Sequence, residues 1–253
     1  MSPSDRFFTR PSARLSRRVP PVISTWTNGL ICRDALYLGH QTAMRFTGAS
    51  ILLMATIGGL AYALIHKPLH TPGYPSITLN NMADQSGLIL VAAVAWWLVA
   101  LLDVVVSIGV YRLYRLTHDR LATITAVLRA GYAVTLALAA FVLLNSALGG
   151  DSSIVYVGFE RFELTWSAGL LIFGSHLICL GLLAHQSRTT PQPIGWLLIC
   201  AGVSYLVTKV GWFADFALTA IEPFLALAMV FGELSFAIWL LVASRKPVTP
   251  IVS

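Results

Sequence analysis

Charged residues are scarce in this chain, at 11% of its 253 residues, and acidic residues are the rarer of the two signs. Apolar residues make up 57% of the sequence, and the mean hydropathy is +0.75. Ordinary soluble domains carry about 25% charged residues, which keep their surfaces hydrated. The composition therefore excludes a soluble globular protein and indicates an integral membrane protein.

Cysteine is also rare: Cys32, Cys179 and Cys200 are the three in the chain, and no two of them form a CxxC motif. The sequence thus lacks a disulfide framework. Proline is absent from the interior of the long apolar stretches, because from Pro68 onward each proline falls in a connection or at the start of an apolar segment. This absence argues against the broken helices that build many transporter sites.

Long apolar runs are abundant, by contrast, and they are continuous. A bilayer core about 30 Å thick requires roughly 20 apolar residues per helix. Six segments meet this requirement, and they are Phe46–Ile65, Gly87–Val110, Leu121–Ala147, Glu163–Ala184, Ile194–Phe213 and Pro223–Ala243. The sequence therefore predicts an all-α, polytopic transmembrane helix bundle with six spans.

Lysine and arginine collect on alternate connections, and such residues favour the cytoplasmic side of a membrane. One side holds Arg45 with six earlier arginines, Arg112, Arg115, Arg120, Arg188, Arg245 and Lys246, whereas the other holds only Lys67 and Arg161. We expect both termini to be cytoplasmic in a multi-pass protein of the bacterial cytoplasmic (inner) membrane. Because the basic residues are spread over several connections, nucleic acid is not an expected partner.

Both ends of the chain differ from its apolar middle. Residues 1–43 contain repeated Pro and Ser, six arginines and no run long enough to span a bilayer. This composition predicts a basic, disordered N-terminal tail, followed by a transmembrane domain over residues 44–246 and a short C-terminal tail over 247–253. Met44, directly before Arg45, is an alternative initiator, in which case the tail would not be translated.

Five ionisable residues lie inside the predicted spans: Asp103, Arg129, His176, Lys209 and Glu233. A bare charge at the bilayer centre costs about 2.5 kcal/mol or more, so such groups pair, become neutral or face polar surroundings. Asp103 and Arg129 lie at matched depth, roughly 10 to 12 Å from the cytoplasmic boundary. We expect Asp103 to pair with Arg129, and Glu233 to pair with Lys209, His176 or a backbone carbonyl.

A face of small residues lies beside Glu233 on the last predicted span. Ala228, Gly232 and Ser235 form this face, which allows a neighbouring helix backbone to come close. We therefore expect Glu233 to point into the bundle and not toward lipid. Its protonation state is left open by the sequence.

No residue set in the sequence matches a metal, haem or catalytic site. His176 and Cys179 share a helical face, but a metal site would need two more ligands nearby. His66 and His70 have i, i+4 spacing, yet Pro68 between them is expected to prevent the helix that would align them. We expect no metal, no cofactor and no catalytic residue.

Four stretches carry a resemblance to a known family: "MRFTGASILLMATIGGLAYALI" from Met44, "YRLYRL" from Tyr111, "FGSHLICLGLLAHQSRTTPQPIGWLLICAGVSYLV" from Phe173 and "FGELSFAIWLLVASRK" from Phe231. Together they resemble the bacterial membrane family known as domain of unknown function 4386, over roughly Arg45 to Lys246. The resemblance implies a polytopic helical fold and places Gly232 and Glu233 in a family motif. It implies no activity.

Three classes of function are compatible with these observations. A structural, accessory or regulatory role in the inner membrane is preferred, because paired polar groups order helices where the hydrophobic effect cannot. A small-molecule or proton-coupled transporter using Glu233, Asp103 and Arg129 is the alternative, and an intramembrane enzyme is the least favoured reading. The expected partners are the lipid bilayer and either another membrane protein or a second copy of the chain.

Overall fold

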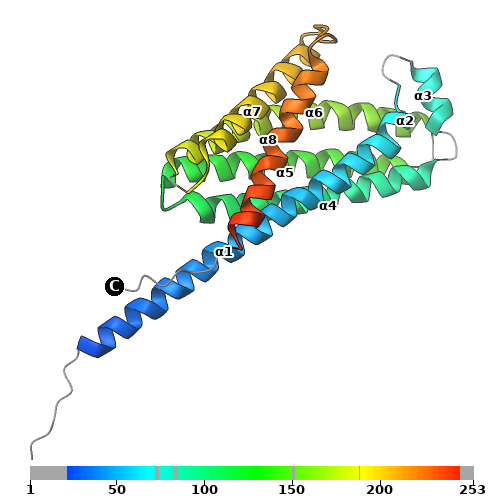
Figure 1. Ribbon diagram of the computed structural model, residues 1–253. Helices are drawn as coiled ribbons and strands as arrows, with labels where there is room; N and C mark the ends of the chain where they lie inside the picture. Colours follow the sequence, from blue (N-terminus) through cyan, green and yellow to red (C-terminus); the bar gives the residue numbers. More distant parts are fainter. Residues whose placement is uncertain (1–21, 72–73, 83–84, 150–151, 188, 246–253) are drawn as a thin grey trace, which may run out of the picture. The chain divides into compact units, whose positions relative to one another are not determined.

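A computed structural model describes the backbone of residues 22–71, 74–82, 85–149, 152–187 and 189–245 (Figure 1). The chain divides into two compact units, residues 1–38 and residues 39–253. Of the first unit, residues 22–38 are described, and they are helical. The second unit contains every side chain considered below.

The described residues form helices and no strands, which confirms the predicted all-α fold. In chain order the elements are α1 (Val22–Ala61), the π-helical turn η1 (Tyr62–His66), α2 (Lys67–Leu69), α3 (Pro75–Met82), α4 (Ser86–Tyr114), α5 (Asp119–Leu148), α6 (Ser152–Gln186), α7 (Gln192–Phe213) and α8 (Glu222–Ala243).

Six stretches of the described chain are helical, long and apolar enough to cross a bilayer: Gly39–Leu69, Gly87–Tyr114, Asp119–Leu148, Ser153–Gln186, Gln192–Phe213 and Glu222–Ala243. The six predicted spans are therefore present, but the fourth begins at Ser153 and not at Glu163. Val155, Phe159 and Phe162 recur on one face of α6 and are buried. The packing of these three side chains into the bundle stabilises the first turns of α6, although charged residues lower the hydropathy of the sequence there.

The later part of the predicted tail, residues 22–43, is helical and is assigned to α1, which begins at Val22. The disordered tail over residues 1–43 stays a prediction. Residues 1–21 and 246–253, where the remaining parts of the two predicted tails fall, lie outside the described residues.

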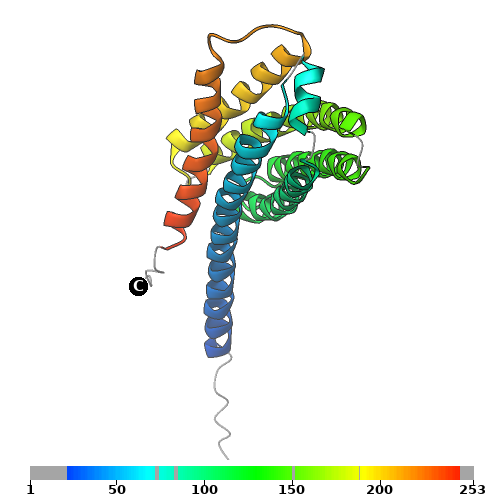
Figure 2. The same cartoon turned by 90° about the vertical axis from the view of Figure 1, so that its right-hand side faces the viewer.

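Helices α4 to α8 pack in chain order, each against the next. Short connections make such neighbours antiparallel. The short helix α3 lies on α6 near the point where α6 begins, as both views show (Figures 1 and 2). Helix α1 meets α4 closely, because a Cβ atom on Gly109 would lie 1.9 Å from the hydroxyl oxygen of Thr47. The bundle thus brings the ends of α1, α5 and α7 together with the starts of α4, α6 and α8.

Helices α6 and α7 approach each other through two pairs of glycines. A Cβ atom on Gly174 would lie 2.8 Å from the carbonyl oxygen of Gly202, and one on Gly202 would lie 2.6 Å from that of Gly174. Gly181 and Gly195 are related in the same way, at 2.7 and 3.1 Å. Small residues at matched positions allow backbone-to-backbone packing, which replaces the hydrophobic driving force that lipid removes.

Helix α8 packs on α7 through the small-residue face. A Cβ atom on Gly232 would lie 2.5 Å from the Cβ atom of Ala201 and 2.8 Å from the carbonyl oxygen of Leu197. Gly232 is buried, while Ala228 and Ser235 are half-buried. The Ser235 hydroxyl donates to the Gly232 carbonyl of its own helix at 3.0 Å. Close approach is therefore centred on Gly232.

The orientation of the bundle is a prediction from its basic residues. We expect reporter fusions to place the connection at Arg115 inside the cell and the connections at Pro72 and Asp151 outside, because Lys and Arg hold short loops in the cytoplasm. An external signal from the Arg115 fusion would overturn this orientation. The end of the bundle that carries His66, Leu148 and Phe213 is called the outer end below.

Candidate functional site

An ion pair in the core of the bundle links α4 to α5. Arg129 Nη2 lies 2.6 Å from Asp103 Oδ1, and both side chains are almost fully buried. The guanidinium also contacts the sulfur of Met54 on α1 at 3.2 Å and lies 4.7 Å from the ring centre of Phe173 on α6. The predicted pairing of Asp103 with Arg129 is therefore present. Through the contacts of Arg129, it connects α1, α4, α5 and α6 in the core of the bundle.

A central cavity of about 570 Å³ lies between α1 and α8 and is lined by α4, α5, α6 and α7 as well. Its ionisable lining consists of Asp103, Glu222, Glu233 and Lys209. Its aromatic lining consists of Tyr62, Trp96, Tyr132, Trp166, Phe173 and Tyr205. The cavity thus combines carboxylates, one ammonium group and several aromatic rings within the span of the membrane.

The shape of the central cavity follows from how α1 and α8 are arranged. The two helices meet toward the end of the bundle opposite the outer end, where a Cβ atom on Gly48 would lie 2.9 Å from the carbonyl oxygen of Ala237. From that contact they separate toward the outer end (Figure 1). The cavity lining reaches Glu222 at the start of α8. The cavity lining therefore extends from the level of Glu233 to the outer end, where α8 begins.

Glu233 lines the central cavity and accepts a hydrogen bond from the Tyr205 hydroxyl at 2.9 Å. Among the described residues it forms no ion pair, so the expected partnership with Lys209 is wrong. The sequence predicts Lys209, His176 or a backbone carbonyl as the partner and does not predict Tyr205. A signal existed, since tyrosines of membrane proteins favour the interfaces and Tyr205 lies well inside α7.

Lys209 and His176 are held by groups other than Glu233. The Lys209 ammonium donates to the Ser167 hydroxyl at 3.3 Å. It also lies 5.6 Å from the ring centre of Trp166 and 6.0 Å from that of Trp212. His176 is fully buried, and its Nδ1 donates to the Thr125 carbonyl at 2.8 Å. Lys209 therefore faces the cavity, whereas His176 links α6 to α5.

A second polar cluster lies at the outer end, where η1 and α2 face the first turns of α6. His66 Nε2 donates to Glu163 Oε1, and His70 Nε2 donates to Glu160 Oε1 at 2.8 Å. The rings of His66 and His70 have centres 5.9 Å apart. These four residues are called the outer cluster.

The expectation that Pro68 would keep His66 and His70 apart is wrong. Pro68 lies near the end of the continuous helix Gly39–Leu69, directly after the π-helical turn, and a π-helical turn is one of the places where a helix tolerates the hydrogen bond that a proline removes. The π-helical turn Tyr62–His66 precedes it and continues the helix into α2. Both imidazoles therefore reach α6. In the sequence, the signal for this cluster is the pair of carboxylates Glu160 and Glu163, which lie three residues apart near the start of a predicted span.

A vestibule of about 390 Å³ connects the two polar regions. Its lining includes His70, Glu160 and Glu163 of the outer cluster, and also Trp212, Phe216 and Leu218. Tyr62, Thr208, Lys209 and Glu222 line both the vestibule and the central cavity. The two hollows therefore adjoin at these four side chains.

The family described as "Domain of unknown function (DUF4386)" matches residues 46–243. The chain belongs to this family. The resemblance seen in the sequence is thereby confirmed. A protein of Archaeoglobus fulgidus described as uncharacterized is 26% identical over 150 residues, which cover 59% of this chain and 82% of the relative. No solved structure matches the chain.

The segment that matches the DUF4386 family, residues 46–243, contains both polar regions. Every residue that lines the central cavity or the vestibule falls between residues 46 and 243, and so does the whole outer cluster. Helix α1 before Phe46 lies outside the family segment. The residues considered for function are therefore those of the shared membrane domain.

Proposed function

We propose that this DUF4386 protein binds a small organic amine in the central cavity and carries it across the bacterial cytoplasmic membrane. The observation that carries the proposal is a cavity that reaches Glu233, a membrane-embedded carboxylate that forms no ion pair among the described residues. A carboxylate at this depth is costly unless a cation, a proton or polar surroundings compensate it. An amine would supply the missing charge.

The size and lining of the cavity support a small cationic solute. Binding sites for small molecules usually measure about 300 to 1,000 Å³, and the central cavity, at about 570 Å³, falls within that range. Rings such as Trp96, Tyr132 and Phe173 present faces that attract cations. Lys209 stands beside Trp166 and Trp212 near the vestibule, which leaves the deeper carboxylate for the solute.

The arrangement of α1 and α8 supports transport over simple binding. The cavity adjoins the vestibule, and α1 and α8 lie in close contact at Gly48 and Ala237, toward the expected cytoplasmic side. Release to the cytoplasm would require α1 and α8 to part at this contact. The π-helical turn of the first span lies where the two hollows meet, and such turns are frequent at functional sites.

Asp103 and Arg129 have a structural part in this proposal. They neutralise each other at 2.6 Å, so neither needs a solute to compensate its charge. Glu233 alone among the five intramembrane ionisable residues is assigned to solute recognition. This differs from a transport site built jointly from Glu233, Asp103 and Arg129.

The substitution Glu233→Gln tests whether the charge of Glu233 binds the amine or only stabilises the fold. Glutamine keeps the shape and a hydrogen bond to Tyr205 but removes the charge, so we expect a folded protein that binds benzylamine about 10- to 100-fold more weakly. Binding would be measured on purified protein in lipid nanodiscs, from the shift of the thermal unfolding midpoint with ligand concentration. Asp215→Asn is the matched control, because Asp215 lines neither hollow and its φ of 52° suits asparagine.

Two comparisons decide the outcome. Benzyl alcohol and benzoate should not bind, since they lack the cationic group, and equal binding of all three compounds would refute recognition by Glu233. Uptake of radiolabelled benzylamine into proteoliposomes should be lost in Glu233→Gln and retained in Asp215→Asn. Binding without uptake would leave a membrane receptor or accessory protein as the function.

A further inference from the structure

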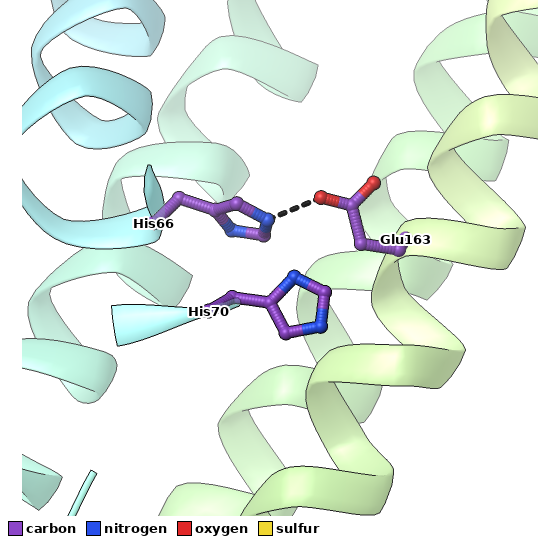
Figure 3. Close-up of side chains that lie close together, drawn as sticks. All are labelled: His66, His70 and Glu163. Carbon is purple, nitrogen blue, oxygen red and sulfur yellow. Dashed lines mark hydrogen bonds and ion pairs between the residues drawn. The ribbon is translucent and has the colours of Figure 1, made fainter. Parts of the chain in front are cut away.

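We propose that His66, His70 and Glu163 form a binding site for a divalent transition metal ion, with Zn²⁺ the best chemical fit. Each of the three side chains offers one ligand atom, and these atoms all lie within 4.8 Å of one another. Figure 3 shows that the three groups come from two directions and converge on one region between η1, α2 and α6. This site is separate from Glu233 and does not depend on the proposed solute.

The ligand set suits zinc. Zn²⁺ is bound by imidazole nitrogens and carboxylate oxygens at about 2.0 to 2.2 Å, and two histidines with one glutamate are a known three-ligand set. Tetrahedral ligands at that distance lie about 3.4 Å apart. Closing the present spacing requires side-chain movements of roughly 1 Å, and rotation of the Glu163 side chain can supply them. The ion would take the place of the proton shared by His66 and Glu163.

The surroundings of His70 follow the pattern of a metal ligand. One of its ring nitrogens faces the His66–Glu163 pair, and the other points away (Figure 3). His70 Nε2 donates to Glu160 at 2.8 Å, so the nitrogen that faces the pair is Nδ1. Metal-binding histidines usually donate their second nitrogen to a carboxylate in this way, which fixes the tautomer and the ring orientation.

His66 is held in place by aromatic neighbours. Its ring centre lies 5.5 Å from that of Tyr62, 5.1 Å from that of Phe159 and 5.3 Å from that of Phe162. The side chain is almost completely buried. Confinement of this kind lowers the entropy lost when a ligand residue binds an ion.

A fourth coordination position would face the vestibule. His70 and Glu163 both line that hollow, so water or a solute could reach an ion held between them. Three protein ligands with one open position characterise zinc sites that bind or activate a further group, whereas purely structural sites use four protein ligands. The inference is therefore an accessible Zn²⁺ site at the entrance to the central cavity.

The test is zinc binding by the full chain, purified with a tag that contains no histidine and stripped with a chelator. Titration against a fluorescent zinc indicator should show one tight site per chain, and Co²⁺ should give the intense visible bands of four-coordinate cobalt. Mg²⁺ at the same concentration should not compete, because it prefers six oxygen ligands. Absence of a tight site, or binding that Mg²⁺ displaces, would overturn the proposal.

Three variants show which residues hold the ion. His70→Gln and Glu163→Gln should each lower the zinc affinity at least 100-fold, whereas Glu160→Gln should lower it about 10- to 100-fold and keep the stoichiometry. His118→Asn is the control, because asparagine preserves a side-chain acceptor at the start of α5, where His118 Nδ1 now accepts from the Leu121 N–H. Unchanged affinity in folded His70→Gln, checked by size-exclusion chromatography, would assign the zinc to another place. Loss of zinc binding with intact benzylamine binding would separate this site from the solute cavity.

Discussion

Replacing Arg129 by methionine is expected to lower the free energy of unfolding by about 3 to 5 kcal/mol, because it leaves Asp103 as an unpaired buried group. Asp103 is fully buried, and Arg129 Nη2, 2.6 Å away, is its counter-charge. Methionine retains much of the packing volume beside Met54 and Phe173, so the loss of charge dominates. Unfolding would be followed by tryptophan fluorescence during titration with denaturing detergent.

The exchange variant tests whether the two side chains act as a pair. Asp103→Arg combined with Arg129→Asp restores opposite charges at the same depth, so we expect it to be less destabilising than either single replacement. Residues in direct contact typically show interaction energies of 0.5 to 3 kcal/mol. Additive effects of the two single changes would show that the pair does not stabilise the bundle as a unit.

Replacing Gly202 by alanine is expected to destabilise the protein by about 1 to 3 kcal/mol through overpacking. The added Cβ atom would lie 2.6 Å from the Gly174 carbonyl oxygen and 2.9 Å from the Ile178 backbone nitrogen. Both are backbone atoms of α6, so the helices themselves must move apart. The thermal unfolding midpoint in detergent would report the change.

Gly59→Ala is the matched control for Gly202→Ala. Both glycines lie within helices, but a Cβ atom on Gly59 would meet nothing within 4 Å. Alanine is favoured over glycine in a helix by about 1 kcal/mol, so this variant should be neutral or stabilising. Equal effects at the two positions would contradict the backbone-to-backbone packing of α6 and α7.

The number and place of the spans could be predicted from the sequence because a bilayer imposes a length. Backbone groups in lipid must be satisfied within the helix, and each crossing therefore leaves a long apolar run. The same constraint gives depth along the membrane normal. The pairing of Asp103 with Arg129 follows from the sequence for this reason, since their helices are consecutive and carry the two groups at the same depth.

The partner of Glu233 could not be predicted because depth says nothing about rotation around the helix axis. In a soluble bundle, the apolar stripe of each helix shows which face is buried. The spans of this chain are apolar on all sides, so no stripe identifies the face of α7 that carries Tyr205 toward α8. The rotation of each helix is set by where its glycines allow close contact. Gly232 of α8 packs on Leu197 and Ala201 of α7, and this contact places Glu233 beside the cavity.

The sequence by itself determined that this is a six-span helical membrane protein and which charged residues lie within the bilayer. Only the tertiary structure decided that Glu233 lines a cavity, that Lys209 turns to Ser167 and two tryptophans, and that His66 and His70 meet Glu163 and Glu160. The physical reason is the solvent. Lipid fixes the length and depth of every helix through its thickness, but it is as apolar as the helices and so leaves their rotation, their spacing and the hollows between them to side-chain packing.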